Sequence, residues 1–387
     1  MLSGEDAVNR RPAIASFVLL GTVGVLSFIV QPALVQGFVS VLGLTESSAV
    51  DLAGIEMAGV ALATVLIALL GDRISWRWLT ALSLLIATVG NAASVIALHG
   101  GGLAAARFVA GLGHGGVISL SFTFVGLTRR IERNLALYLV SLLTYGALVI
   151  WLAPRLFASV GLGGMFGAFA VASAASLLVV GYLPQSSAAR TLQAPRARQL
   201  PPWLLAIALA SVLAYNLAQG IAWAILFLVG TGAGHDEQHV ADALLASQAT
   251  AVIGALGAVF LAERWRRGPA ITVGILGGAL CIGLLLGPLP IGVYTLAVCG
   301  FNLLWNFVLP FILGAVSDMD LRGRMMSPAI AVQMIGLGLG PIVSARLISG
   351  RSYAMAEEAC IAAFIVSLVL LALPLRAHAV RARAARG

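Results

Sequence analysis

The chain has 387 residues, of which 60% are hydrophobic and only 10% are charged. Its mean hydropathy of +1.02 is more than a water-soluble protein of this length can hide in one core, which excludes an ordinary soluble domain. The formal net charge is +8, and all 23 basic residues are arginines. In a soluble protein this charge would suggest nucleic acid, but here the arginines lie between long apolar segments, as in membrane proteins.

Twelve apolar segments, each long enough to cross a bilayer, fill most of the chain. A hydrocarbon core about 30 Å thick needs roughly 20 residues of helix, and backbone polar groups in lipid must be satisfied within the segment. The sequence therefore predicts an all-α integral membrane protein with twelve transmembrane helices. Their expected ranges are 13–36, 47–71, 76–98, 101–127, 134–157, 163–183, 202–230, 238–262, 269–287, 290–314, 325–349 and 356–374.

The segments fall into two sets of six on either side of a basic linker. The expected parts are an N-terminal six-helix bundle at 1–183, a cytoplasmic linker at 184–201 and a C-terminal six-helix bundle at 202–387. An acid followed by arginine recurs at equivalent places, at Asp72–Arg73 after the second segment and at Glu263–Arg264 after the eighth. Duplicated halves of this kind are typical of secondary transporters, whose substrate site lies between the bundles.

The arginines also predict the orientation of the chain in the membrane. If the N-terminus is cytoplasmic, 19 of the 23 arginines fall on the cytoplasmic side. The opposite loops then carry acids at Glu46, Asp236, Glu237, Glu357 and Glu358. We expect a multi-pass protein of a bacterial inner membrane with both termini in the cytoplasm.

Glycines at a spacing of four occur in several predicted helices. The pairs are Gly111 with Gly115, Gly163 with Gly167, Gly274 with Gly278, and Gly336 with Gly340. Small residues at this spacing let helices approach closely, so we expect tight packing at all four pairs. The run 111–116 also satisfies G-x-G-x-x-G, but no strand precedes it, so we expect no dinucleotide site and no cofactor.

The turn 71–77 and the stretch Arg-Phe-Val-Ala-Gly-Leu-Gly at 107–113 resemble the major facilitator superfamily. Together with the twelve spans and the central linker, the resemblance covers essentially the full chain. It implies a transporter that works by alternating access and is not an enzyme. It also implies that the helix two to three signature, here Asp72, Arg73 and Arg77, gates the cytoplasmic side. The Gly-Pro-x-x-Gly-Gly stretch of drug exporters is missing from 142–154, which lowers the expectation of drug export.

Charged residues inside the spans are rare and point to function, because a lone charge at a helix centre costs about 2.5 to 3.5 kcal/mol. Asp51 and Glu56 lie in the second segment, and Arg107 and His114 lie in the fourth. From the outer ends, Arg107 falls at about 9 Å, Glu56 at about 13 Å and His114 at about 19 Å. Depth therefore allows a Glu56–Arg107 pair, which either holds the bundle together or exchanges a proton. We expect Glu56, Arg107 and Asp51 to serve in proton coupling.

Amides and indoles cluster in the seventh and tenth segments. The clusters are Asn216, Gln219 and Trp223, and Asn302, Trp305 and Asn306. In the resembling family, helices one, four, seven and ten line the central cavity, which implies that these residues and His114 contact the substrate. The alternative is hydrogen bonding between helices. With two indoles and no acid at this depth, we expect a neutral or weakly anionic, ring-containing solute.

The sequence thus predicts a monomeric secondary active transporter that moves a small organic solute together with protons. No metal, cofactor or nucleic acid is expected. An uncoupled facilitator is the alternative mechanism. A non-transporting membrane sensor or assembly protein is an alternative from another class. The permease of an ATP-driven pump is disfavoured because the chain lacks the Glu-Ala-Ala loop that docks an ATPase.

Overall fold

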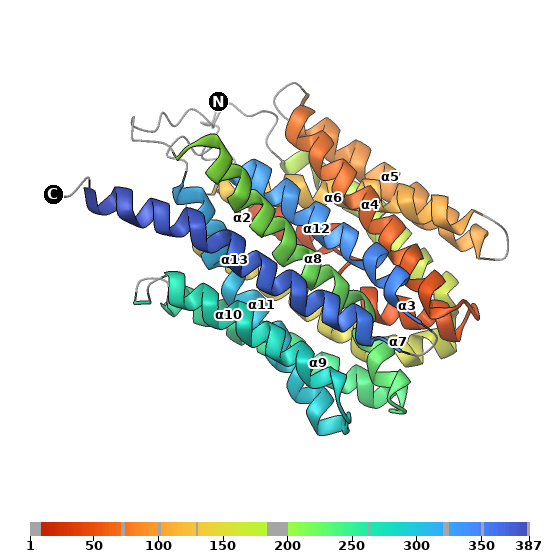
Figure 1. Cartoon of the computed structure of the whole chain (residues 1–387). Coiled ribbons are helices and arrows are strands. Elements are labelled where there is room, and N and C mark those ends of the chain that lie inside the picture. The colour runs from red at the N-terminus through yellow and green to blue at the C-terminus, as the bar shows by residue number, and fades with distance from the viewer. Residues whose placement is uncertain are drawn as a thin grey trace. The chain divides into compact units, whose positions relative to one another are not determined.

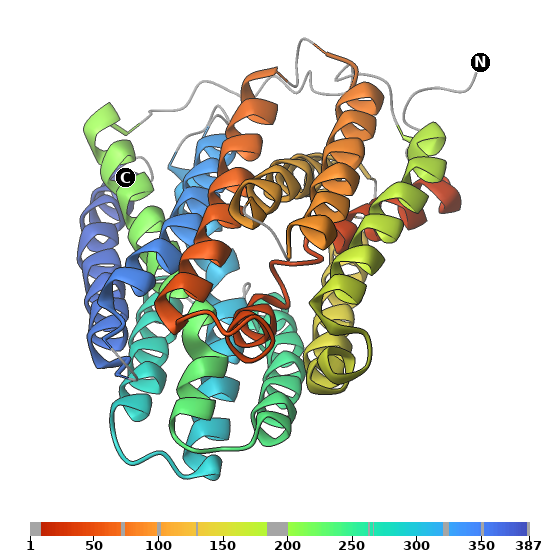
Figure 2. The same cartoon turned by 90° about the vertical axis from the view of Figure 1, so that its right-hand side faces the viewer.

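The structure is a computed structural model that describes most of the chain. It covers 9–70, 74–98, 102–128, 131–183, 200–261, 264–265, 267–319, 325–349 and 352–384. These residues are helical apart from turns and one isolated bridge between Ser349 and Ser352 (Figures 1 and 2). Ten helices in this part of the chain are long and apolar enough to cross a membrane. The chain divides into two compact units, Met1–Thr191 and Leu192–Gly387.

The first unit is centred on α6. Its elements are α2 (Arg11–Gly24), α3 (Gln31–Ser40), α4 (Glu46–Leu70), α5 (Trp76–Ala97), α6 (Leu103–Gly126), α7 (Ile131–Ala175) and the 3-10 helix η1 (Ser176–Tyr182). Helix α6 packs against α2, α4 and α5, so residues from three neighbouring helices meet around it (Figure 1).

Glycines bring α4 and α5 onto the backbone of α6. A Cβ atom added at Gly111 would lie 2.0 Å from the carbonyl oxygen of Glu56, and one at Gly113 would lie 2.1 Å from the nitrogen of Ala87. At Gly115 the added atom would meet a carbonyl oxygen of α4 at 2.4 Å. The expected packing role of Gly111 and Gly115 is confirmed, because no side chain fits where these helices cross.

The prediction of one continuous first helix at 13–36 is wrong. Helix α2 ends at Gly24, and the turn Val25–Val30 separates it from α3. Pro32, in the first turn of α3, has no N–H for the carbonyl of Phe28, which accepts instead from the nitrogen of Gln31 at 3.2 Å. Proline is favoured at a helix start, so the second half of this span begins where Pro32 allows it.

Another helix satisfies a backbone group that the turn frees. The hydroxyl of Tyr145 in α7 donates to the carbonyl oxygen of Leu26 at 2.6 Å. Irregular backbone inside a membrane is tolerated where protein groups take over its hydrogen bonds. The turn therefore holds its shape, and it places Ser27 inside the first unit, where the side chain is buried.

Helix α7 contains the predicted fifth and sixth spans, 134–157 and 163–183, in one run. Gly161 interrupts it with φ 63° and ψ −175°, a conformation that glycine adopts without strain. The sixth span then ends in η1 and not as an α-helix. The boundary between the two predicted spans therefore falls at Gly161.

The second unit is arranged around α8 and α11. Its elements are α8 (Pro202–Gly232), α9 (Glu237–Leu261), α10 (Arg267–Gly283), the 3-10 helix η2 (Leu284–Leu286), α11 (Ile291–Asp318), α12 (Met326–Leu347) and α13 (Ala354–Ala384). Helix α8 packs against α12 and α13, whereas α11 packs against α9 and α10 (Figure 1). Helix α13 runs ten residues beyond the predicted end of the last span, 356–374.

The glycine pairs outside α6 have different outcomes. A Cβ added at Gly340 would lie 2.3 Å from the backbone of Gly220, and Gly336 also meets the backbone of α8, so that prediction is confirmed. At Gly274 the nearest atoms belong to a side chain, at 2.5 Å, and Gly278 has only ordinary contacts. Tight packing is wrong for Gly163 and Gly167, because a Cβ at Gly163 would make ordinary contacts and one at Gly167 would meet nothing within 4 Å.

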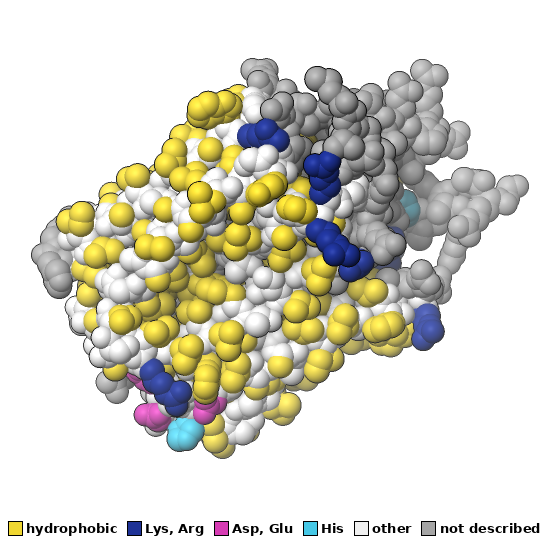
Figure 3. Space-filling view, turned by 180° about the vertical axis from the view of Figure 1, so that it is seen from behind, with side chains coloured by type: hydrophobic (Ala, Val, Ile, Leu, Met, Phe, Trp, Pro, Cys, Tyr) yellow, Lys and Arg dark blue, Asp and Glu magenta, His cyan; other side chains and the backbone are white. Residues whose placement is uncertain are grey.

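Large apolar side chains are exposed on the outer surfaces of the helices. Ile96 and Leu178 are 82% and 83% exposed, and hydrophobic side chains cover much of the face seen in Figure 3. Water would make so much exposed apolar surface an aggregation hazard, whereas lipid solvates it. The surface agrees with a multi-pass membrane protein.

Candidate functional site

A buried ion pair joins α4 to α6 in the first unit. One guanidinium nitrogen of Arg107, Nη2, lies 2.5 Å from Oε1 of Glu56, and Nε donates to Oε2 at 3.1 Å. Arg107 is 0% exposed and Glu56 is 4% exposed. The pair expected from depth along the two helices is present, and its two parallel hydrogen bonds are the strongest geometry available to these groups.

Asn91 in α5 links the guanidinium to His114 in α6. Nη1 of Arg107 donates to Oδ1 of Asn91 at 2.9 Å. Because guanidinium nitrogens can only donate, this contact fixes the orientation of the amide and directs its Nδ2 to Nε2 of His114, 3.1 Å away. Nε2 must then accept, so the hydrogen-bond pattern places the imidazole proton on Nδ1.

Ser27, from the turn between α2 and α3, closes the network. Its Oγ lies 3.1 Å from Nδ1 of His114 and donates to Oε1 of Glu56. We name the cycle of Ser27, Glu56, Asn91, Arg107 and His114 the buried polar ring. The ring joins α4, α5 and α6 to the break in the first span.

Two further residues surround the guanidinium of Arg107. Nη1 also donates to Oγ of Ser94 at 3.3 Å, and the ring centre of Phe166 lies 4.5 Å from Cζ. A cation beside an aromatic face in a water-poor site gains electrostatic stabilisation. Arg107 is therefore compensated by an acid, an amide, a hydroxyl and an aromatic ring.

The sequence predicted part of this ring. Glu56 and Arg107 meet as expected, but His114, predicted to contact substrate, has both ring nitrogens engaged within the ring. Asp51 is half-buried on α4 and is not one of the five members. Asn91 was missed, although an amide in the middle of the third apolar segment was a readable signal. Ser27 was missed because a continuous helix was expected there.

The predicted gating residues are only partly visible. Asp72 and Arg73 lie outside the described residues. Arg77 is half-buried at the start of α5, and its Nε donates to the carbonyl oxygen of Leu183 at 2.6 Å. A cation is favourable at the C-terminal end of a helix, so Arg77 stabilises the C-terminal end of η1 and ties it to α5.

In the second unit, the two predicted indoles meet. Trp223 in α8 and Trp305 in α11 make a T-shaped contact with ring centres 5.9 Å apart, and the ring centre of Phe301, also in α11, lies 5.9 Å from that of Trp305. Trp223 is buried and Trp305 is half-buried. These rings form an aromatic cluster between α8 and α11.

The amides of α11 bind different partners, one in another helix and one in α11 itself. Nδ2 of Asn302 donates to Oγ of Ser247 in α9 at 2.8 Å, and Nδ2 of Asn306 donates to the carbonyl oxygen of Asn302 at 3.0 Å. The contact of Asn302 with α9 matches the alternative of hydrogen bonding between helices, and its expected contact with the substrate stays a prediction. Asn306 is half-buried and stays a candidate contact.

The amides of α8 differ, because their oxygens accept no hydrogen bond from the described residues. Asn216 and Gln219 are buried, and their nitrogens donate to the carbonyl of Val212 and the hydroxyl of Tyr215, each at 2.8 Å. Neither Oδ1 of Asn216 nor Oε1 of Gln219 has a hydrogen-bond partner among the described residues. A buried acceptor without a donor costs about 1–3 kcal/mol, so each oxygen is able to accept a hydrogen bond from a water molecule or a ligand.

This architecture, with many apolar helices and charged groups buried inside them, is that of a polytopic membrane protein whose intramembrane charges indicate a functional site. The family model described as "Major Facilitator Superfamily" matches residues 13–341, so the chain belongs to the major facilitator superfamily. The chain is accordingly a transporter and not an enzyme. No curated protein matches it in sequence at a significant level.

Solved transporter structures share the fold. A crystal structure of a D-xylose–proton symporter has a TM-score of 0.71 at 15% identity, covering 92% of this chain and 97% of that chain. A nucleoside transporter, a mutant of NupG, also scores 0.71 at 14% identity, covering 94% and 99%. A bacterial homologue of the human lysosomal transporter Spinster, inward-facing and unoccupied, scores 0.66 at 14% identity, covering 97% and 96%. At these identities the likeness establishes the fold.

Proposed function

We propose that this protein is a secondary active transporter of a bacterial inner membrane that moves a small organic solute by alternating access, coupled to protons. Ten helices qualify as spans, and one of them, Leu137–Tyr182, is long enough at 46 residues for two crossings. The pair α2 and α3 supplies one more. This supports twelve spans in two six-helix bundles, 1–183 and 202–387, joined by the cytoplasmic linker 184–201.

The observation that carries proton coupling is the buried polar ring. In the ring, the hydroxyl of Ser27 links the imidazole N–H of His114 to the carboxylate of Glu56 by two hydrogen bonds. A proton on Glu56 would cancel the charge that holds Arg107 and free the guanidinium for another partner. A proton on Nε2 of His114 would face the donating amide of Asn91 and force that amide to turn. Either event breaks the ring, so protonation and helix arrangement are coupled.

The second unit supports the choice of solute. The unpaired oxygens of Asn216 and Gln219 accept hydrogen bonds, and the indoles of Trp223 and Trp305 suit a ring. We propose a neutral or weakly anionic ring-containing solute that carries hydroxyl or N–H donors. Two structural neighbours are a D-xylose–proton symporter and a nucleoside transporter, and D-xylose and nucleosides are solutes of this chemical kind.

A transport experiment tests this function. Purified protein in proteoliposomes is given labelled D-xylose and uridine, with and without an imposed pH gradient and with a protonophore as control. Accumulation above the external concentration that the protonophore abolishes is the expected result for at least one of the two. Downhill flux that ignores the gradient identifies an uncoupled facilitator. The absence of flux for these and a wider panel of neutral ring solutes identifies a sensor or assembly protein.

The orientation is open to a labelling experiment. Cysteines introduced at Ser187 in the linker and at Asp236 in the loop before α9 are exposed to an impermeant thiol reagent on intact cells. We expect labelling at Asp236→Cys only. Labelling at Ser187→Cys alone contradicts cytoplasmic termini.

The gate is a further part of the proposal. Asp72, with Arg73 and Arg77, acts at the cytoplasmic end of the first unit, where Arg77 already ties α5 to the end of η1. Asp72→Asn should leave solute binding near normal and slow transport strongly. Transport at the unmodified rate removes Asp72 from the mechanism.

A further inference from the structure

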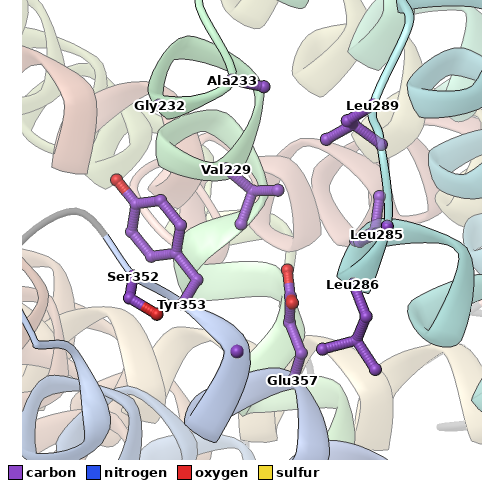
Figure 4. Close-up of a pocket in the computed structure, with 11 residues that line it drawn as sticks. Val229, Gly232, Ala233, Leu285, Leu286, Leu289, Ser352, Tyr353 and Glu357 are labelled. Carbon is purple, nitrogen blue, oxygen red and sulfur yellow. The ribbon is translucent and has the colours of Figure 1, made fainter.

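A cavity in the second unit holds a carboxylate that the proposed transport cycle does not use. The cavity has a volume of about 230 Å³ and lies between the end of α8, η2 and the start of α13 (Figure 4). Aliphatic side chains of Val229, Leu285, Leu286 and Leu289 line it. Glu357 is only 4% exposed, and Figure 4 shows its carboxyl group pointing into the space between Val229 and Leu286.

The carboxyl group of Glu357 lacks a compensating partner. Among the described residues, none donates a hydrogen bond to it and none forms an ion pair with it. Taking an ionised carboxylate out of water is costly unless a cation or several donors replace the water. The same chain compensates Glu56 with Arg107 and Ser27. Glu358, the next residue, is exposed and adds negative charge near the cavity.

The two helix ends beside the cavity carry opposite partial charges. Val229, Gly232 and Ala233 line it at the C-terminal end of α8, where a helix carries partial negative charge. Ala354, at the N-terminal end of α13, contributes the opposite partial charge. The two partial charges oppose each other, so the ionised form of Glu357, once a cation stabilises it, decides the sign of the site.

We propose that this cavity binds a small hydrophobic ammonium ion. Its charged nitrogen lies against Glu357, and its hydrocarbon part lies against the aliphatic wall. The ring of Tyr353, which also lines the cavity, adds an aromatic surface that favours a cation. This site goes beyond the proposed transport function, because it uses residues at one end of the second unit and needs neither flux nor proton movement.

A pair of ligands that differ in charge tests the site. Cyclohexylamine is protonated at neutral pH, and cyclohexanol has the same ring without the charge. The full-length protein in detergent is heated with increasing concentrations of each. A ligand that binds only the folded state raises the unfolding temperature. We expect a saturable rise of several degrees with cyclohexylamine and no rise with cyclohexanol.

Two acids that are adjacent in sequence give a matched pair of variants. Glu357→Gln keeps the size of the side chain and should abolish the cyclohexylamine effect, whereas Glu358→Gln alters an exposed acid and should retain it. A second variant, Ala233→Leu, fills the cavity while keeping Glu357 and should also abolish the effect. Ala233→Leu changes α8 and leaves Glu357 intact. It therefore still tests the site if Glu357→Gln fails to fold.

Three results would overturn the proposal. Equal stabilisation by cyclohexanol would show an apolar pocket around an uncharged carboxyl group. A cyclohexylamine effect that persists in Glu357→Gln would place the binding elsewhere. Arg351 lies outside the described residues, so Arg351→Ala is included. An effect that appears only in Arg351→Ala would show that the chain fills the site with its own arginine.

Discussion

Buried polar atoms have hydrogen-bond partners in the ring of the first unit, whereas two amide oxygens on α8 of the second unit have none among the described residues. In the ring, Glu56 and Arg107 satisfy each other together with an amide, an imidazole and a hydroxyl. On α8, Asn216 and Gln219 each keep an amide oxygen without a donor among the described residues. A satisfied network is costly to break, and an unsatisfied group is ready for a ligand. The comparison therefore supports the proposal that the ring takes part in proton coupling and that α8 contacts the solute.

Removing the ring's cation should have the largest effect on stability. Arg107→Met leaves the Glu56 carboxylate buried without its cation, and breaking a buried pair in this way costs about 3–5 kcal/mol. The double variant Glu56→Gln with Arg107→Met should recover part of that loss. Unfolding in detergent measures both, with Arg155→Ala, an exposed arginine, as a control expected to change little. Equal stability of Arg107→Met and the parent would contradict a compensating ring.

Crowding the helix crossing that supports the ring should come next. Gly111→Ala drives a methyl group onto the carbonyl oxygen of Glu56, and overpacking of this kind costs about 1–3 kcal/mol. Gly167→Ala is the matched control, because an added Cβ there meets nothing within 4 Å. Thermal unfolding compares the two. If Gly167→Ala is the more damaging change, α4 and α6 do not cross as described.

An Asn-to-Leu substitution should lower stability in the ring but solute affinity in α8. Asn91→Leu leaves a guanidinium N–H and an imidazole nitrogen unpaired, at a cost of about 1–3 kcal/mol. Asn216→Leu removes an oxygen that had no donor, so stability should stay within about 1 kcal/mol while solute affinity falls. Unfolding and solute binding are measured on both variants. A larger loss of stability in Asn216→Leu would reverse the comparison.

Sequence predicted an all-helical membrane protein with long apolar helices, because the length and apolarity of such helices follow from the bilayer itself. It also predicted that Glu56 and Arg107 could meet, because rise per residue sets depth. It did not predict which neighbouring helix a side chain contacts, so the hydrogen bond from Asn302 to Ser247 in α9 became visible only in the structure. The break at Val25–Val30 was missed although Pro32 marked a helix start. An uninterrupted apolar run outweighed that signal.

Loss of the ring's hydroxyl should give the smallest effect. Ser27→Ala removes the donor to Glu56 and the neighbour of Nδ1 of His114, which should lower stability by about 1 kcal/mol and slow proton-driven uptake. Ser16→Ala is a suitable control, since Ser16 is also buried but bonds only the backbone of its own helix. If the two variants transport alike, Ser27 does not link His114 to Glu56.

The central claim is that Glu56 carries the coupled proton while the second unit holds the solute. Glu56→Gln in proteoliposomes tests it most directly, with D-xylose or uridine, whichever the parent accumulates, as the labelled solute. We predict that the variant exchanges this solute across the membrane at a rate near that of the parent but does not concentrate it under a pH gradient. Accumulation by Glu56→Gln equal to that of the parent would contradict the account.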